Sequence, residues 1–163
     1  MEQTARHPFL ADFYTDIEKY KLETELAFVL LHYHQLHVLD ESANVVTDFS
    51  QGKDLIFARM NLEGADLSLF ETLYSHLSGR LAPPVLTVVL DLPVSTLMER
   101  VNKRARSYEL KMPVEYLERL LQFYDKERDL LGPHVRFVSV SPDATQEEVA
   151  IRVADIIRET ARL

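Results

Sequence analysis

Cysteine is absent from the 163-residue sequence, and glycine occurs only four times, at positions 52, 64, 79 and 132. The lack of cysteine excludes disulfides and thiolate metal sites. The shortage of glycine matters more, because a phosphate-binding loop of the form G-x-x-x-x-G-K-[ST] needs glycines whose backbone N–H groups close on the phosphates. No two glycines are five apart, and no lysine precedes serine or threonine. The sequence therefore contains no such loop.

A long hydrophobic run is missing as well. The longest apolar stretch, residues 26–31, is far shorter than the roughly 20 residues that cross a bilayer, and the first ten residues form no apolar signal core. We expect no membrane segment and a location in the cytoplasm. The net charge of −8 and the isoelectric point near 5.2 disfavour nucleic acid as a partner.

The sequence does contain enough apolar residues for one domain. Hydrophobic residues make up 47% of the chain, which predicts a single domain over residues 1–163. Apolar residues that recur at three- and four-residue steps predict helices in the first half, one of them capped by Asp16. A β-prone run at 44–49 predicts a strand. The helices are expected at residues 8–15, 16–39, 53–61 and 66–80.

The second half alternates strands with helices. The continuous apolar run VLTVVLDLP (85–93) predicts a buried parallel strand, and HVRFVSVS (134–141) predicts another. A terminal helix should follow, with Thr145 as its N-cap and Glu148 at the capping-box position. Strands separated by helices predict a doubly wound α/β sheet. The intervening helices are expected at residues 94–106 and 113–131.

Charged residues follow the predicted strands, at the sheet edge where such proteins bind ligands. Asp48 suits Mg²⁺ held through water, but a turn aspartate that caps the next helix explains it equally well. Arg100 and Arg104 are one helical turn apart, with Arg106 just beyond. Guanidinium groups so placed can grip a polyphosphate, whereas a solvated helix face is the commoner reason for such a cluster.

Histidines at positions 32, 34 and 37 fall on the long predicted helix. Because no neighbouring carboxylate is fixed beside them, a solvated polar edge is expected rather than a metal site.

Three segments, in order, resemble the deoxynucleoside kinase family. The family's N-P-F-L-x-x-F-Y opening and long nucleoside-binding helix are similar to HPFLADFYTDIEKYKLETELAFVLLHYHQL, and its next strand and I-F-A helix to VVTDFSQGKDLIFARMNL. The family's arginine-bearing lid, R-G-R-x-x-E-x-x-I-x-x-x-Y-L-E, is similar to KRARSYELKMPVEYLERL. The bacterial branch is the most similar, because there an aspartate and an aromatic residue, here Asp48 and Phe49, replace Glu-Arg-Ser.

The resemblance implies a three-layer, P-loop-kinase-like α/β fold with a parallel sheet of order 2-3-1-4-5. In that order the first strand is central and leads into the phosphate-binding loop, which this sequence lacks. We therefore expect residues 1–163 to be a deoxynucleoside kinase-like domain truncated at its N-terminus, without the first strand and the P-loop.

The resemblance also implies roles for individual residues. Glu2 matches the general base that acts on the sugar 5′-hydroxyl, and Asp48 matches the acidic catalytic residue near Mg²⁺. Tyr14 and Glu109 match groups that bind the deoxyribose 3′-hydroxyl. Glu25 lies where the family often has a base-reading glutamine, Phe57 matches the ring that stacks on the base, and Lys53 lies near a family aspartate. Arg100, Arg104 and Arg106 match lid arginines that grip the ATP phosphates. Arg104 and Arg106 also match groups that contact the transferred phosphoryl group.

In the complete family, this site phosphorylates a deoxynucleoside 5′-hydroxyl with ATP and Mg²⁺ for nucleotide salvage. The acceptor atoms of a glutamate at position 25 match the amino group of adenine or cytosine, or guanine N1–H and N2, better than the thymine edge. Without the P-loop, the chain by itself is expected to be inactive. The alternative is a non-catalytic remnant that binds nucleosides or dimerises without an ATP site. The resemblance implies a homodimer through the long helices.

Overall fold

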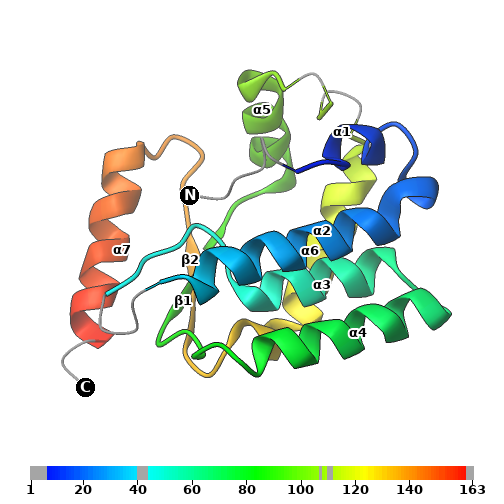
Figure 1. Cartoon of the computed structure of the whole chain (residues 1–163). Helices are drawn as coiled ribbons and strands as arrows, with labels where there is room; N and C mark the ends of the chain where they lie inside the picture. The colour runs from blue at the N-terminus through cyan, green and yellow to red at the C-terminus, as the bar shows by residue number, and fades with distance from the viewer. Residues whose placement is uncertain (1–6, 40–43, 107, 110–111, 161–163) are drawn as a thin grey trace.

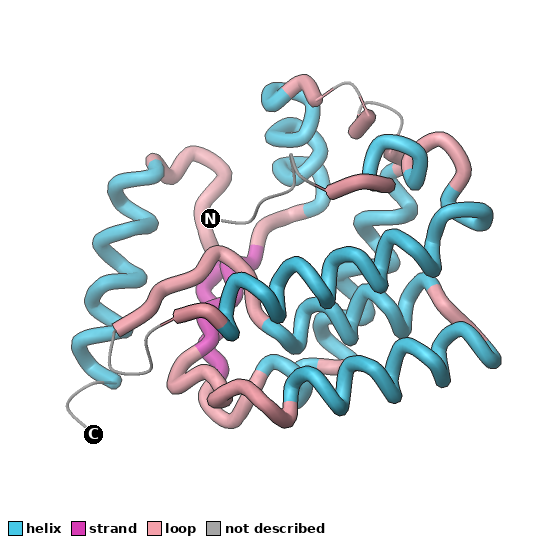
Figure 2. Tube along the Cα trace, viewed as in Figure 1, coloured by secondary structure: helices cyan, strands magenta, loops and turns pink. Residues whose placement is uncertain are grey.

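The computed structural model describes residues 7–39, 44–106, 108–109 and 112–160. Helices dominate this part of the chain, and a short sheet connects them (Figure 2). No helix in these ranges is long and apolar enough to cross a membrane. In chain order the elements are α1 (Leu10–Phe13), α2 (Ile17–His37), α3 (Gln51–Asn61), α4 (Gly64–Ser78), β1 (Thr87–Asp91), α5 (Val94–Arg104), α6 (Val114–Lys126), the 3-10 helix η2 (Arg128–Leu131), β2 (Val135–Ser139) and α7 (Gln146–Thr160).

The sheet of the described residues has two parallel strands. Thr87 of β1 lies opposite Val135 of β2, and the pairing continues to Asp91 opposite Ser139. Between the strands the chain runs through α5, α6 and η2, which is the crossover that parallel strands require. This arrangement confirms the predicted α/β class and the two strands of the second half.

Two details of the strand predictions are wrong. Residues 44–49 form no strand, and Val45 and Val46 are 45% and 83% exposed. The run has strand-like composition, but no neighbouring strand in the described part of the chain pairs with it, and composition alone does not make a strand. β1 is only partly buried, with Leu90 43% exposed, because a strand with one paired neighbour is covered less than a strand in the middle of a sheet.

Helices lie on both sides of the sheet, giving three layers (Figure 1). On one side is α7, from which Val149 and Ile156 pack against the cluster of Leu92, Val138 and Val140. On the other side are α2, α3, α4 and α6. The larger core lies among these helices and is built on Val29, Leu55, Ala58, Leu62 and Phe70.

Side-chain caps mark the start of α2, α3 and α7. Asp16 accepts a hydrogen bond from the backbone N–H of Lys19, as predicted. Ser50 accepts from the N–H of Lys53, which starts α3 two residues earlier than the apolar pattern indicates. Thr145 and Glu148 bond reciprocally to each other's backbone N–H groups, so the predicted capping box is confirmed.

Gly52 allows α3 to approach η2 closely. A Cβ atom at position 52 would lie 2.0 Å from the carbonyl oxygen of Leu130 and 3.0 Å from the Cα atom of Leu131. Only glycine fits this contact without movement of the backbone. The first turn of α3 is thereby held against the chain that leads into β2.

Candidate functional site

A chain of polar side chains links α2, α3 and α6 inside the helical layer. The amide nitrogen of Asn61, the last residue of α3, donates to Oε1 of Glu25 at 2.7 Å and lies 3.3 Å from the hydroxyl oxygen of Tyr116. Glu25 comes from the middle of α2 and is only 2% exposed. Val29, one turn later on α2, belongs to the apolar core. A carboxyl group has therefore been placed on the buried face of a core helix.

The surroundings of Glu25 favour its protonated form. The pKa of Glu25 is raised to about 8, mainly by burial and also by the charge of the nearby Asp54. The hydrogen bond from Asn61 and the charge of Lys53 lower the pKa but do not offset burial. At neutral pH Glu25 is mostly a neutral acid.

Tyr14 lies within electrostatic range of both Glu25 and the predicted lid residues. It directly follows α1, and burial raises the pKa of its hydroxyl above the usual range. The charge of Glu109 raises this pKa further and that of Arg104 lowers it, while Glu25 also contributes. The ring of Tyr14 stacks on that of Tyr108 with 6.0 Å between centroids. The structure therefore brings together Tyr14, Glu25 and Glu109, three residues predicted to contact one ligand.

Glu109 holds two of the three predicted lid arginines. Its Oε2 accepts from Nε and Nη2 of Arg104 at 2.9 and 2.6 Å, and its Oε1 accepts from Nη1 of Arg106 at 3.3 Å. Glu109 is 5% exposed, so its charge is neutralised inside the protein by these guanidinium groups. Arg100 lies one turn earlier on α5, is exposed, and has no ion pair among the described residues.

The turn between the two paired arginines has an unusual backbone. Ala105 ends α5 with φ of +51°, in the left-handed region that favours glycine. This reversal of the chain allows Arg106, which follows the helix, to reach the same carboxylate as Arg104 at the end of the helix.

Aromatic rings and one ammonium group lie between α2 and α3. Nζ of Lys53 is 5.5 Å from the ring centroid of Phe28 and 5.6 Å from that of Phe57. Both distances are within the range of cation–π attraction. Phe57, predicted to stack on a base, also meets the ring of Tyr124 edge to face at 6.4 Å. Lys53, Phe57 and Asn61 recur every four residues and so share one face of α3.

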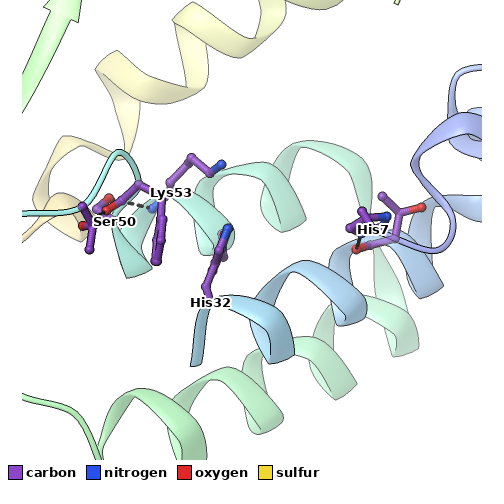
Figure 3. A network of polar contacts seen from close by, with 8 residues as sticks. His7, His32, Ser50 and Lys53 are labelled. Carbon is purple, nitrogen blue, oxygen red and sulfur yellow. Dashed lines mark hydrogen bonds and ion pairs between the residues drawn. The ribbon is translucent and has the colours of Figure 1, made fainter. Parts of the chain in front are cut away.

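A buried histidine–aspartate pair lies next to this face. Nδ1 of His32 donates to the two carboxylate oxygens of Asp54 at 2.8 and 2.9 Å, and both residues are at most 2% exposed. Figure 3 shows His32 reaching from α2 toward the start of α3, where Ser50 and Lys53 lie. The ring of Phe49 stacks on His32 at 4.1 Å. The prediction of a solvated edge is thus wrong for His32, because Asp54, 22 residues away in the chain, meets it across the helix interface.

His7 contacts α2 nearer to its N-terminus than His32 does. Its Nε2 donates to the carbonyl oxygen of Thr24 at 3.0 Å, and its Nδ1 accepts from the N–H of Phe9. The ring centroid of His7 also lies 4.1 Å from that of Phe28. Figure 3 shows His7 and His32 at separate places along α2. His7 therefore anchors the segment that leads into α1 and Tyr14.

The predicted catalytic and metal residues are less well defined. Glu2 lies outside the described residues. Asp48 is exposed in the segment before α3, beside the buried Phe49. No group of three histidine, aspartate or glutamate side chains able to hold a metal occurs in the described ranges. An exposed carboxylate is a ligand type that Mg²⁺ with most of its waters can use. The lid arginines remain the predicted contacts for ATP, and the described residues form no cradle of glycine backbone N–H groups.

Comparison with known proteins gives consistent matches. Residues 2–159 match the family model "Deoxynucleoside kinase". The deoxyguanosine kinase of Bacillus subtilis (strain 168) is 27% identical over 167 residues, covering 93% of this chain and 81% of that protein. The deoxyadenosine kinase of Dictyostelium discoideum is 26% identical over 129 residues, covering 76% of this chain and 53% of that protein.

Solved structures agree with the sequence matches. Deoxyadenosine kinase from M. mycoides with bound dCTP superposes with a TM-score of 0.77 at 19% identity, covering 98% of this chain and 84% of that one. The same enzyme with bound dATP gives 0.79 at 20% identity, covering 96% and 84%. The fold is therefore that of the P-loop-kinase-like α/β proteins. The chain belongs to the deoxynucleoside kinase family, whose model spans nearly all of it.

Sequence reasoning missed Asn61, Tyr108 and Tyr116. Asn61 is separated from Glu25 by 36 residues and Tyr116 from Asn61 by 55. One sequence signal was available for Asn61, since it lies one turn beyond Phe57 on the same face of a predicted helix.

Proposed function

We propose that this protein is a deoxynucleoside kinase, which transfers the γ-phosphoryl group of ATP to the 5′-hydroxyl of a deoxynucleoside in nucleotide salvage. Membership of the family supports the reaction class. The observation that carries the proposal is the position of Tyr14, a half-buried residue whose hydroxyl lies within electrostatic range of both Glu109 and Glu25. Glu109, which suits the sugar, and Glu25, which suits the base, thus lie near the same tyrosine.

Hydrogen bonding assigns the two ends of the substrate. A deoxyribose 3′-hydroxyl both donates and accepts, so it can donate to Glu109 and accept from Tyr14. The base would reach Glu25 across the face of α3 that carries Phe57 and Lys53, with the Phe57 ring against its plane. This assignment uses only side chains that the structure brings together or places on one helix face.

Charge assigns the lid. Arg104 and Arg106 already meet at the carboxylate of Glu109, close to Tyr14. Guanidinium groups there would stabilise negative charge that develops on a phosphoryl group near the sugar. Arg100, exposed one turn earlier, would contact the distal phosphates of the donor.

The remaining roles rest on resemblance to the family. Glu2 would act as general base on the 5′-hydroxyl, and Asp48 would hold Mg²⁺ through water. The phosphate loop is not encoded in the 163 residues, and we propose that a strand and loop outside them complete the domain. The matched part covers 81% of the Bacillus subtilis enzyme, which leaves room for such a segment.

A cytoplasmic location and a homodimer are also part of the proposal, and exposed apolar side chains support the homodimer. Leu30 of α2 is 49% exposed, and Leu69 of α4 is 55% exposed. Apolar side chains on two helices in mutual contact offer a surface that a second copy could cover. Sedimentation equilibrium of the wild type and of Leu30→Lys tests this directly, since the charged variant should be monomeric.

Two assays on one preparation test the main proposal. Calorimetry measures binding of deoxyadenosine, deoxyguanosine and thymidine to the 163-residue chain, and a chromatographic assay with ATP and Mg²⁺ measures formation of the monophosphate. We expect a deoxynucleoside with an amino-bearing base to bind more tightly than thymidine. Monophosphate should form only after the N-terminal strand–loop segment of a relative is joined to the chain.

Each assay has an outcome that contradicts one part of the proposal. A folded chain that binds no deoxynucleoside contradicts the substrate site. Monophosphate made by the 163 residues alone contradicts the need for a further segment. Nucleoside binding that stays without phosphorylation, even after the segment is joined, favours a binding protein over a kinase.

A further inference from the structure

The carboxyl group of Glu25 is unusual among the acidic side chains of the described residues. It is 2% exposed, accepts one hydrogen bond from Asn61 at Oε1, and has no ion pair in the described part of the chain. The other two buried acids, Asp54 and Glu109, each have a cationic or histidine partner. An ionised carboxylate buried with a single neutral donor is costly, so the group either carries a proton or must find donors in a ligand.

The charges that face Glu25 do not compensate its burial. From α3 come Asp54, which opposes ionisation, and Lys53, which favours it. Tyr116 from α6 and Tyr14 from the end of α1 complete the titratable neighbours, and burial raises the pKa of both tyrosines, which keeps them neutral. Because Asp54 raises the pKa of Glu25 and Lys53 lowers it, burial is the deciding influence on that pKa.

Asn61 determines which oxygen carries the proton. Its amide nitrogen donates to Oε1 at 2.7 Å, so Oε1 acts as an acceptor in this bond. The described residues give Oε2 no hydrogen bond, so a base bound at Glu25 would supply its partner. A proton on Oε2 makes the side chain a donor at Oε2 and an acceptor at Oε1, which is the pattern of a glutamine amide.

We propose that Glu25 reads the base as a neutral carboxylic acid oriented by Asn61, and that loss of its proton changes which base edge the site accepts. This inference rests on the proposed function, because it assigns the base to this pocket. The neutral acid matches an edge with one donor and one acceptor side by side, as in adenine (N6–H and N1) and cytosine (N4–H and N3). The carboxylate matches two adjacent donors, as in guanine (N1–H and N2–H).

The affinity for deoxyadenosine should therefore depend on pH in one direction. Below the pKa of Glu25, about 8, the donor on Oε2 is present and the affinity is constant. Above it, deoxyadenosine must bring a proton back to Oε2, so the dissociation constant should rise about tenfold per pH unit. Deoxyguanosine has a matching edge for either form, so its affinity should fall less.

The test is calorimetry with deoxyadenosine from pH 7.0 to 9.5 on the wild type, Glu25→Gln and Glu23→Gln. Glutamine has the donor–acceptor pattern permanently, so Glu25→Gln should match the wild type at pH 7.0 within about threefold and stay constant to pH 9.5. Glu23→Gln makes the same chemical change on α2 two residues away and should follow the wild-type profile. Circular dichroism confirms that each variant is folded.

A second readout separates base recognition from general pH effects. Near pH 8, comparison of buffers with different ionisation enthalpies should show uptake of about half a proton when deoxyadenosine binds the wild type, and none with Glu25→Gln. Deoxyguanosine has a matching edge for either form of Glu25, so its binding should take up fewer protons than the binding of deoxyadenosine.

The inference is overturned if wild-type affinity for deoxyadenosine is constant to pH 9.5 while Glu25→Gln binds at least tenfold more weakly at pH 7.0, because Glu25 then acts as an anion. Proton uptake that is equal in the wild type and Glu25→Gln overturns it as well. Absence of binding by every folded variant contradicts the proposed function itself, which distinguishes the two failures.

Discussion

Asn61 at the end of α3 donates to the carboxyl group of Glu25 at 2.7 Å, and this is the one hydrogen bond that the described residues supply to that 2% exposed group. The contact joins two helices across the predicted substrate pocket. It also explains how a glutamate can lie in an apolar helix face: burial raises its pKa to about 8, so the side chain enters the core as a neutral acid.

Stability of the free protein should fall as pH rises because of Glu25. Its folded-state pKa, about 8, is above its ordinary value of 4.5, so between these values the native state binds more protons than the unfolded state. The stabilisation is present below pH 4.5 and is lost as pH approaches 8. In urea unfolding, Glu25→Gln should remove this decline and be about 1–3 kcal/mol more stable than the wild type at pH 9.

At pH 5.5 the same two proteins should differ by less, because Glu25 of the folded protein is then protonated and only part of the decline has taken place. A constant difference at all pH values between 5.5 and 9 contradicts the assignment of the decline to Glu25.

Glu109→Gln should weaken binding through the sugar. The carboxylate is the predicted acceptor for the 3′-hydroxyl, and loss of a hydrogen bond to a charged group costs about 1.5–3 kcal/mol, or about 10- to 100-fold in affinity. Calorimetry with 2′,3′-dideoxyadenosine is the control substrate, because without a 3′-hydroxyl the wild type and the variant should bind it alike. Glu115→Gln, at an exposed position in the first turn of α6, should bind both nucleosides as the wild type does. Equal weakening toward both nucleosides would show that Glu109 acts only by holding the arginines.

Ala105→Gly should stabilise the protein. Ala105 has φ of +51°, and a left-handed conformation costs an alanine about 1–2 kcal/mol relative to glycine. The flexibility of glycine in the unfolded chain offsets part of this gain in the free energy of unfolding. Each kcal/mol that remains should raise the melting temperature by about 2–4 °C.

The matched control is Ala27→Gly in the middle of α2, where the backbone is helical. That change should lower stability by about 0.5–1 kcal/mol. A decrease in melting temperature for both variants would contradict the strained turn at Ala105.

Gly52 and Gly64 should respond differently to larger side chains. A Cβ at position 52 would lie 2.0 Å from the Leu130 carbonyl oxygen, whereas Gly64 has φ of +55° and open space around it. Alanine at position 52 should cost about 1–3 kcal/mol through overpacking, and asparagine more. At position 64 asparagine should be tolerated better than alanine, since it adopts the left-handed conformation more readily. Denaturant unfolding of the four variants measures whether the alanine or the asparagine variant is more stable at each position. If the same residue is the more stable at both positions, this account is contradicted.

Local pattern was sufficient to predict most of the helices. The Asp16 cap and the capping box formed by Thr145 and Glu148 involve residues within one turn of each other, so the sequence contains the whole interaction. The parallel arrangement of the strands was equally accessible, because long helical crossovers separate them. Residues 44–49 have the composition of a strand, but a strand also needs a partner, and composition carries no information about the partner.

Contacts between helices were harder to predict. Tyr14, Glu25 and Glu109 were identified through resemblance to a family, and the structure brings them together. Asn61 and the pairing of His32 with Asp54 depend on the packing of α2 against α3, which no local pattern in either helix specifies. Polar residues on a predicted helix are usually exposed, so His32 was assigned to the surface when its partner lay 22 residues away.

The most direct test of the central claim is a crystal structure of this chain with deoxyadenosine. The account predicts the 3′-hydroxyl between Tyr14 and Glu109, and the adenine edge within hydrogen-bond distance of Glu25, with its plane against Phe57. A nucleoside bound elsewhere, or one that lies in this cluster with its base turned away from Glu25, would contradict the account.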